Sequence, residues 1–112
     1  MAKLPTAYQK FAKEYSTVWE AYKELGAAAH GIGPLNTKVR ELIKLGMAVG
    51  ARMEGAVHAH TRRAIEAGAT PDEVRHAALL AITTLGFPIA MAALTWVEDV
   101  LRVKRPSRAR RR

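Results

Sequence analysis

Four side chains suited to acid–base chemistry lie in one stretch of the sequence, residues 40–68. They are Glu41, Glu54, His58 and His60. A histidine can exchange protons near neutral pH, and a nearby glutamate can orient the ring or relay the proton. The sequence contains no cysteine, which excludes thiol catalysis, thiolate metal sites and disulfides within the chain. The chemistry that these residue types favour is therefore proton transfer by histidine and glutamate.

The spacing of the histidines argues against a metal site formed by both of them. We expect residues 53–67 to form a helix, in which each residue turns by about 100°. Glu54 and His58 then share one face, whereas the rings of His58 and His60 point about 160° apart. Because such rings cannot reach one ion from a single helix, we predict no metal site.

Glu41 and His60 each have a structural interpretation beside the catalytic one. Glu41 could be a surface residue paired with Lys38 or Lys44, its neighbours one helical turn away. It lies, however, within an apolar run from Val39 to Val49, where an ionisable side chain is of functional interest. His60 has mostly small apolar neighbours and could be a hydrogen-bonded core histidine.

The periodicity of apolar residues predicts an all-α fold with five helices and no strand. The expected ranges are 6–25, 37–49, 53–67, 71–85 and 89–101. Residues 31–36 should form a loop, Gly68 should end a helix, and Thr70 to Glu73 has the pattern of a capping box. Gly26 could end the first helix, although residues 27–30 could prolong it a little. We expect a single domain over residues 1–103.

The net charge of +8 is concentrated at the C-terminal end. Residues 102–112 hold 7 of the 18 basic residues and no acid, which leaves 11 basic against 10 acidic residues elsewhere. This tail could contact nucleic acid or an anionic surface, but we expect residues 104–112 to be a solvated, disordered end.

Residues 77–97 carry no charge and have the length of a membrane span. Gly86-Phe87-Pro88 interrupts this run, so we predict two buried helices rather than a span. There is no signal-peptide core at the N-terminus, and we expect a cytoplasmic protein.

Three pieces of the sequence resemble the carboxymuconolactone decarboxylase and AhpD-like superfamily. They are Arg40-Glu41-Leu42-Ile43, the run from His60 to Glu73, and Gly86-Phe87-Pro88. The similar region runs from about residue 37 to 101. The resemblance implies an all-α protomer that assembles into homotrimers or homohexamers, with a site near His60 and close to a subunit boundary.

The differences from the family pattern narrow the expected activity. The alkylhydroperoxidase branch carries a CxxC pair at the positions of Met53 and Ala56, so a thiol peroxidase is not expected here. Glu41 lies at the position of the glutamate that relays protons in that branch, and His60 lies at the position of that branch's histidine. The decarboxylase branch lacks the CxxC pair and often has acidic residues ahead of this histidine, as at Glu54. Ala56, however, stands where that branch usually has another glutamate. The chain looks slightly more like the decarboxylase branch, with Glu41 retained from the other branch.

This resemblance implies decarboxylation or proton transfer on a small carboxylic acid or lactone, with no cofactor. His60 would transfer the proton, and Glu41 would orient the ring or relay the proton. Further candidates are Arg40 or Arg52 as the anchor of a substrate carboxylate, Met53 and Phe87 as walls, and Glu54 and His58 as secondary site residues.

Two alternatives stay open. Glu41 and His60 could be a structural pair in a non-catalytic protein that binds a small ligand, or several basic tails in an oligomer could bind nucleic acid. Self-association itself is expected on physical grounds, because residues 77–85 are apolar on nearly every side and a five-helix monomer cannot cover them all. We expect the interface to involve this helix, the last helix and the aromatic N-terminal helix.

Overall fold

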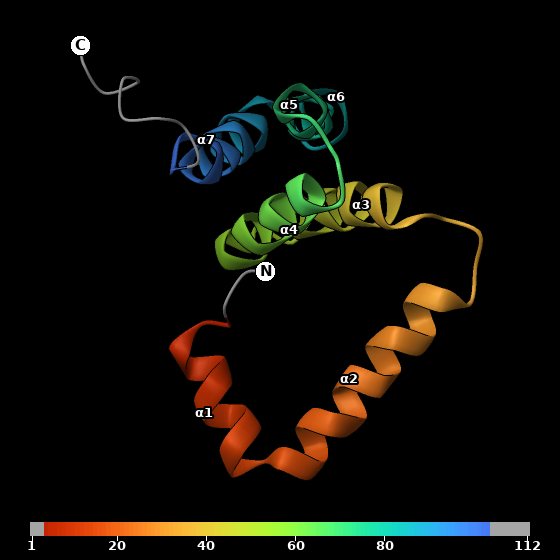
Figure 1. The fold of residues 1–112 in the computed structure, drawn as a ribbon. Coiled ribbons are helices and arrows are strands. Elements are labelled where there is room, and N and C mark those ends of the chain that lie inside the picture. Colours follow the sequence, from red (N-terminus) through yellow and green to blue (C-terminus); the bar gives the residue numbers. More distant parts are fainter. Residues whose placement is uncertain (1–3, 104–112) are drawn as a thin grey trace. The chain divides into compact units, whose positions relative to one another are not determined.

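The computed structural model describes residues 4–103, and all its regular elements are helices (Figure 1). The seven helices are α1 (Thr6–Glu14), α2 (Ser16–Gly31), α3 (Thr37–Gly50), α4 (Glu54–Glu66), α5 (Pro71–Leu79), α6 (Ala81–Thr84) and α7 (Phe87–Val103). The all-α prediction is confirmed. The tail at 104–112 lies outside the described residues, so its predicted disorder stays a prediction.

Two of the five expected helices are divided, which accounts for the count of seven. The first is broken at Tyr15, where φ is −126° and ψ is 54°, and α2 then continues past Gly26 to Gly31. The break brings the rings of Phe11 and Trp19 to 6.2 Å between centroids, whereas eight residues of continuous helix would span about 12 Å. The other division, at Leu80, is milder, because Leu80 keeps right-handed helical dihedrals.

The described residues fall into two compact units, 4–35 and 36–103. The first unit contains α1 and α2, and neither helix has a buried residue. Four of its aromatic rings contact one another: Phe11 contacts Tyr15 and Trp19, and Trp19 also contacts Tyr22. These two helices therefore have no core of their own. The single domain expected over residues 1–103 stays a prediction.

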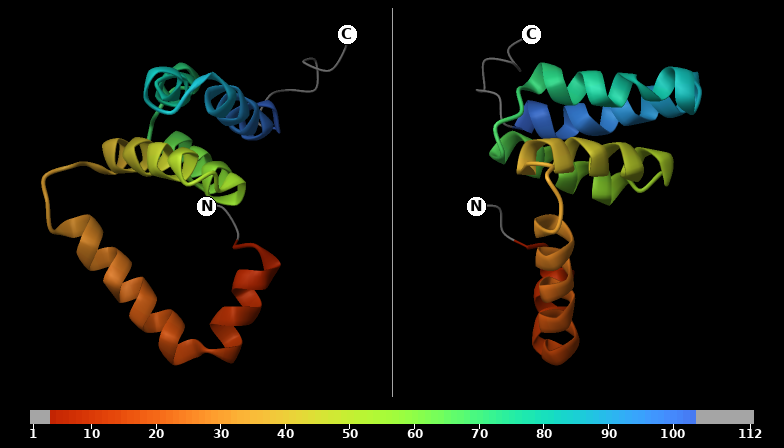
Figure 2. Two further views of the ribbon diagram at one scale, coloured as in Figure 1. Left: turned by 180° about the vertical axis from the view of Figure 1, so that it is seen from behind. Right: turned by 90° about the vertical axis from the view of Figure 1, so that its right-hand side faces the viewer.

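The second unit consists of two helical layers (Figures 1 and 2). α3 and α4 lie side by side in one layer, and α5, α6 and α7 form the other. The core between them is built from small and branched side chains. Its buried members are Leu45, Ala48, Val49, Val57, Ala64, Ala69, Val74, Ala78, Ala81, Ala90, Ala93 and Val97.

Local sequence signals set the ends of the helices that carry the site. The Asn36 side chain accepts a hydrogen bond from the Val39 amide at 2.9 Å and caps α3. The capping box of α5 is confirmed: the Glu73 amide donates to Thr70 Oγ1 and the Thr70 amide donates to Glu73 Oε1, both at 3.0 Å. Gly68 follows α4 with φ of 102°, a conformation that favours glycine.

An ion pair joins α5 to α7 within the second layer. The guanidinium of Arg75 on α5 donates from Nε and Nη2 to the two carboxylate oxygens of Glu98 on α7. This contact with Glu98 raises the pKa of Arg75 above its ordinary value.

Among residues 4–103, no helix is both long enough and apolar enough to cross a membrane.

Candidate functional site

Glu41 and His60 meet between α3 and α4. Glu41 lies on the face of α3 that is buried together with Leu45, Ala48 and Val49, and only 4% of the residue is exposed. His60 Nδ1 is 2.7 Å from Glu41 Oε1, and 15% of the His60 side chain is exposed. The two residues are 19 positions apart in the sequence, so the packing of α3 on α4 creates the pair.

The geometry fixes how the histidine can act. If Glu41 is ionised, its carboxylate only accepts hydrogen bonds, so Nδ1 of His60 is the donor. The second ring nitrogen, Nε2, has no hydrogen-bond partner among residues 4–103. It is also not fully buried, because the fully buried polar side-chain atoms without a hydrogen bond in this part of the chain are Arg40 Nε and Thr61 Oγ1. It is therefore open to another molecule. A carboxylate that holds one ring nitrogen while the other exchanges a proton is the arrangement of a general acid–base.

The interpretation of Glu41 as a surface residue is wrong, because the side chain is buried. Lys38, one of its two expected partners, instead contacts Glu73 on α5, with Nζ 3.2 Å from Oε2. Burial arises because Glu41 shares the face of α3 that packs on α4, whereas Lys38 lies beside α5.

The four expected substrate contacts are not gathered into one cavity with the pair. Arg40 is half-buried next to Glu41 in the sequence, and its Nη2 donates to Thr37 Oγ1 at 3.0 Å. Arg52 has φ of 58° and lines a hollow of about 250 Å³ with Pro88, Ile89, Ala92 and Trp96. Met53 and Phe87 are both more than half exposed. Their proposed contacts with substrate remain predictions.

The secondary candidates Glu54 and His58 lie with a third residue that the sequence did not indicate. His58 Nε2 is 3.1 Å from Asp99 Oδ2 on α7 and 3.9 Å from Glu54 Oε2 on the same helix. His58 thus contacts α7 while His60 contacts α3, in agreement with the divergence expected from the helical wheel. Asp99 is 41 residues from His58 and belongs to no motif, so only the packing of α7 on α4 reveals it.

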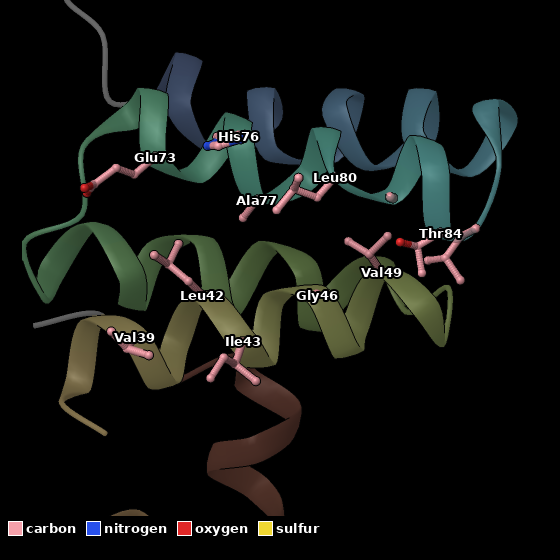
Figure 3. A pocket seen from close by; sticks show the side chains of 12 residues that line it. Val39, Leu42, Ile43, Gly46, Val49, Glu73, His76, Ala77, Leu80 and Thr84 are labelled. Atoms are coloured by element: carbon pink, nitrogen blue, oxygen red, sulfur yellow. The ribbon is translucent and has the colours of Figure 1, made fainter. Parts of the chain in front are cut away.

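An apolar groove of about 500 Å³ runs between α3 and the α5–α6 segment (Figure 3). Its lining is mostly aliphatic, with Glu73 and His76 among its few polar members. The lining residues are Val39, Leu42, Ile43, Gly46, Val49, Glu73, His76, Ala77, Leu80, Ala81, Thr84 and Leu85. The amide of Thr70 and the ammonium of Lys38 hold the pKa of Glu73 below its usual range. Glu41 and His60 are not among the lining residues, so this groove is a separate feature.

Comparison with known proteins agrees with the fold. A family model described as "Carboxymuconolactone decarboxylase family" matches residues 16–99, which extends the expected similarity back from residue 37 into α2. The crystal structure of a carboxymuconolactone decarboxylase family protein from Legionella pneumophila superimposes with a TM-score of 0.78 at 27% identity, covering 89% of each chain. An uncharacterized protein from Haemophilus influenzae is 41% identical over 58 residues. That match spans 52% of this chain and only 51% of the relative.

Proposed function

The chain belongs to the carboxymuconolactone decarboxylase family, and we propose that it catalyses proton transfer on a small carboxylic acid or lactone without a cofactor. The observation that carries the proposal is the 2.7 Å contact between Glu41 Oε1 and His60 Nδ1, with the carboxylate buried and the ring partly exposed. His60 is the proposed acid–base, and Glu41 positions its ring.

In a decarboxylation, the pair would supply the proton that takes the place of the lost carboxylate. When CO₂ leaves a lactone acid, the electron pair of the broken C–C bond passes into the conjugated lactone. A proton must then reach carbon, and His60 Nε2 is the group proposed to deliver it. Glu41 stabilises the ring in the orientation needed for delivery, since it holds Nδ1. Arg40 and Arg52 remain the two proposed anchors for the substrate carboxylate.

The test compares wild type with His60→Gln and Glu41→Gln on muconolactone-type acids, following loss of substrate and release of CO₂. Removal of a positioned acid–base typically lowers the rate by about 10²–10⁴-fold, so we expect a loss of that size for His60→Gln. His30→Gln on α2 is the matched histidine control and should retain the wild-type rate. Equal rates for wild type and His60→Gln, with both proteins folded by circular dichroism, would refute the role of His60.

A second candidate function is binding of a small apolar ligand in the groove, with Glu41 and His60 as a structural pair. It is supported by the groove's volume of about 500 Å³ and its aliphatic lining, which are in the range of small-molecule sites. A Cβ added at Gly46 meets nothing within 4 Å, so Gly46→Leu can place its side chain in the groove. We expect this variant to bind an apolar fluorescent probe more weakly than Gly46→Ala does. Equal probe binding by the two variants would contradict a ligand site here.

A further inference from the structure

We propose that Glu54, His58 and Asp99 bind a divalent transition-metal ion of the Zn²⁺ type, at a site separate from the Glu41–His60 pair. One ligand atom from each of the three side chains lies within 4.8 Å of the other two. One imidazole nitrogen and two carboxylates form a donor set that suits such an ion.

Two helices place these donors. Glu54 and His58 are four residues apart on α4 and so share one face, the same spacing that lets two side chains on a helix bind one zinc ion. Asp99 comes from α7, which packs against α4. His58 Nε2 lies near both carboxylates, at 3.1 Å from Asp99 Oδ2 and 3.9 Å from Glu54 Oε2.

These separations are close to those of a bound ion. Ligand atoms about 2.0–2.1 Å from a tetrahedral Zn²⁺ lie about 3.3 Å apart. The two distances from His58 Nε2, 3.1 and 3.9 Å, lie on either side of that value, and the two carboxylate oxygens lie within 4.8 Å of each other. The side chains of Glu54 and Asp99 are 56% and 50% exposed, and each can turn toward an ion without disturbing the core. Two carboxylates also balance the charge of a divalent cation.

The imidazole selects the class of metal. Mg²⁺ and Ca²⁺ prefer oxygen ligands throughout, whereas a histidine nitrogen favours zinc and its neighbours in the first transition row. Three protein ligands leave at least one coordination position for water or for the carboxylate of another molecule. The ion would connect α4 to α7, because its ligands come from both helices.

The site is independent of the proposed acid–base pair. His58 contacts α7 and His60 contacts α3, and the two sets share no side chain. Without an ion, His58 and Asp99 form a hydrogen bond between two partly exposed side chains. The measurement must therefore separate metal binding from this contact.

The full chain, stripped of metal with EDTA and then freed of the chelator, is titrated with ZnCl₂ by calorimetry, and Zn²⁺ is measured in competition with a chromophoric chelator. We expect one Zn²⁺ per chain and a rise in melting temperature with Zn²⁺ concentration. His58→Ala and Asp99→Asn should each weaken binding at least tenfold, and Glu54→Gln should weaken it as well. His76→Ala, which removes an exposed histidine on α5, is the matched control and should bind as wild type does.

Asp99→Asn and Glu54→Gln change little in side-chain volume, so they keep the test valid if His58→Ala does not fold. Co²⁺ provides a second readout, because its visible absorption reports the ligand geometry and should change in the ligand variants but not in His76→Ala. Absence of stoichiometric Zn²⁺ binding by wild type would overturn the proposal. Binding that is unchanged in Asp99→Asn and Glu54→Gln would overturn it equally, since it would mean general binding to surface histidines.

Discussion

Removing the contact between Glu41 and His60 should reveal strong energetic coupling between the two residues. A hydrogen bond to a charged group contributes about 1.5–3 kcal/mol to stability. Solvent cannot replace this bond at Glu41, because only 6% of its side chain is exposed. We therefore expect a double-mutant cycle with Glu41→Gln and His60→Gln to give a coupling free energy of about 2 kcal/mol.

The assay is urea unfolding followed by circular dichroism for wild type, both single variants and the double variant. Protein concentration is held constant, since self-association would alter apparent stability. Each single variant should lose about 1.5–3 kcal/mol, because it replaces a buried hydrogen bond to a carboxylate with a weaker neutral one. The double variant should lose less than the sum of the two.

The exposed pair His58–Asp99 provides the matched control. Its side chains are 25% and 50% exposed, and a cycle with His58→Gln and Asp99→Asn in EDTA should give only about 0.2–1 kcal/mol. A coupling for Glu41–His60 no larger than that of His58–Asp99 would refute the argument that burial makes the first pair strong. The interpretation of Glu41 as a positioning group would then lose its physical basis.

Four further predictions concern the helices and the assembly. Gly46→Ala should raise the free energy of unfolding by about 0.5–1 kcal/mol, since Gly46 lies inside α3 with open space around an added Cβ. Gly68→Ala should lower it by about 1–2 kcal/mol because φ is 102°, and thermal melts that rank these variants in the opposite order would contradict both. Glu73→Gln should be less stable than wild type at neutral pH, and the difference should shrink as the pH falls below about 4.3 and through the lowered pKa of Glu73. Parallel stability–pH curves for the two proteins would show that the carboxylate contributes nothing. Light scattering after size exclusion should give three or six times the 12.3 kDa chain mass, because α1 and α2 bury no residue, and a monomer would contradict the expected assembly.

The sequence determined the helical architecture and most helix ends, because these depend on local interactions. The apolar periodicity predicted the helices, and the capping box at Thr70 and Glu73 marked the start of α5 without any tertiary contact. Local reasoning missed the break at Tyr15, where no glycine or proline is present to mark it. It also missed the division at Leu80, where the backbone departs little from a helix.

Only the tertiary structure decided which ionisable residues meet. In the sequence, Glu41 has lysine neighbours one helical turn away. The family resemblance assigned it a role beside His60 but did not indicate which atoms are in contact. The packing of α3 on α4 buries its carboxylate against His60, and the packing of α7 on α4 brings Asp99 to His58. Partners 19 and 41 residues apart leave no mark on local periodicity, because their proximity arises from how helices pack rather than from how each helix forms.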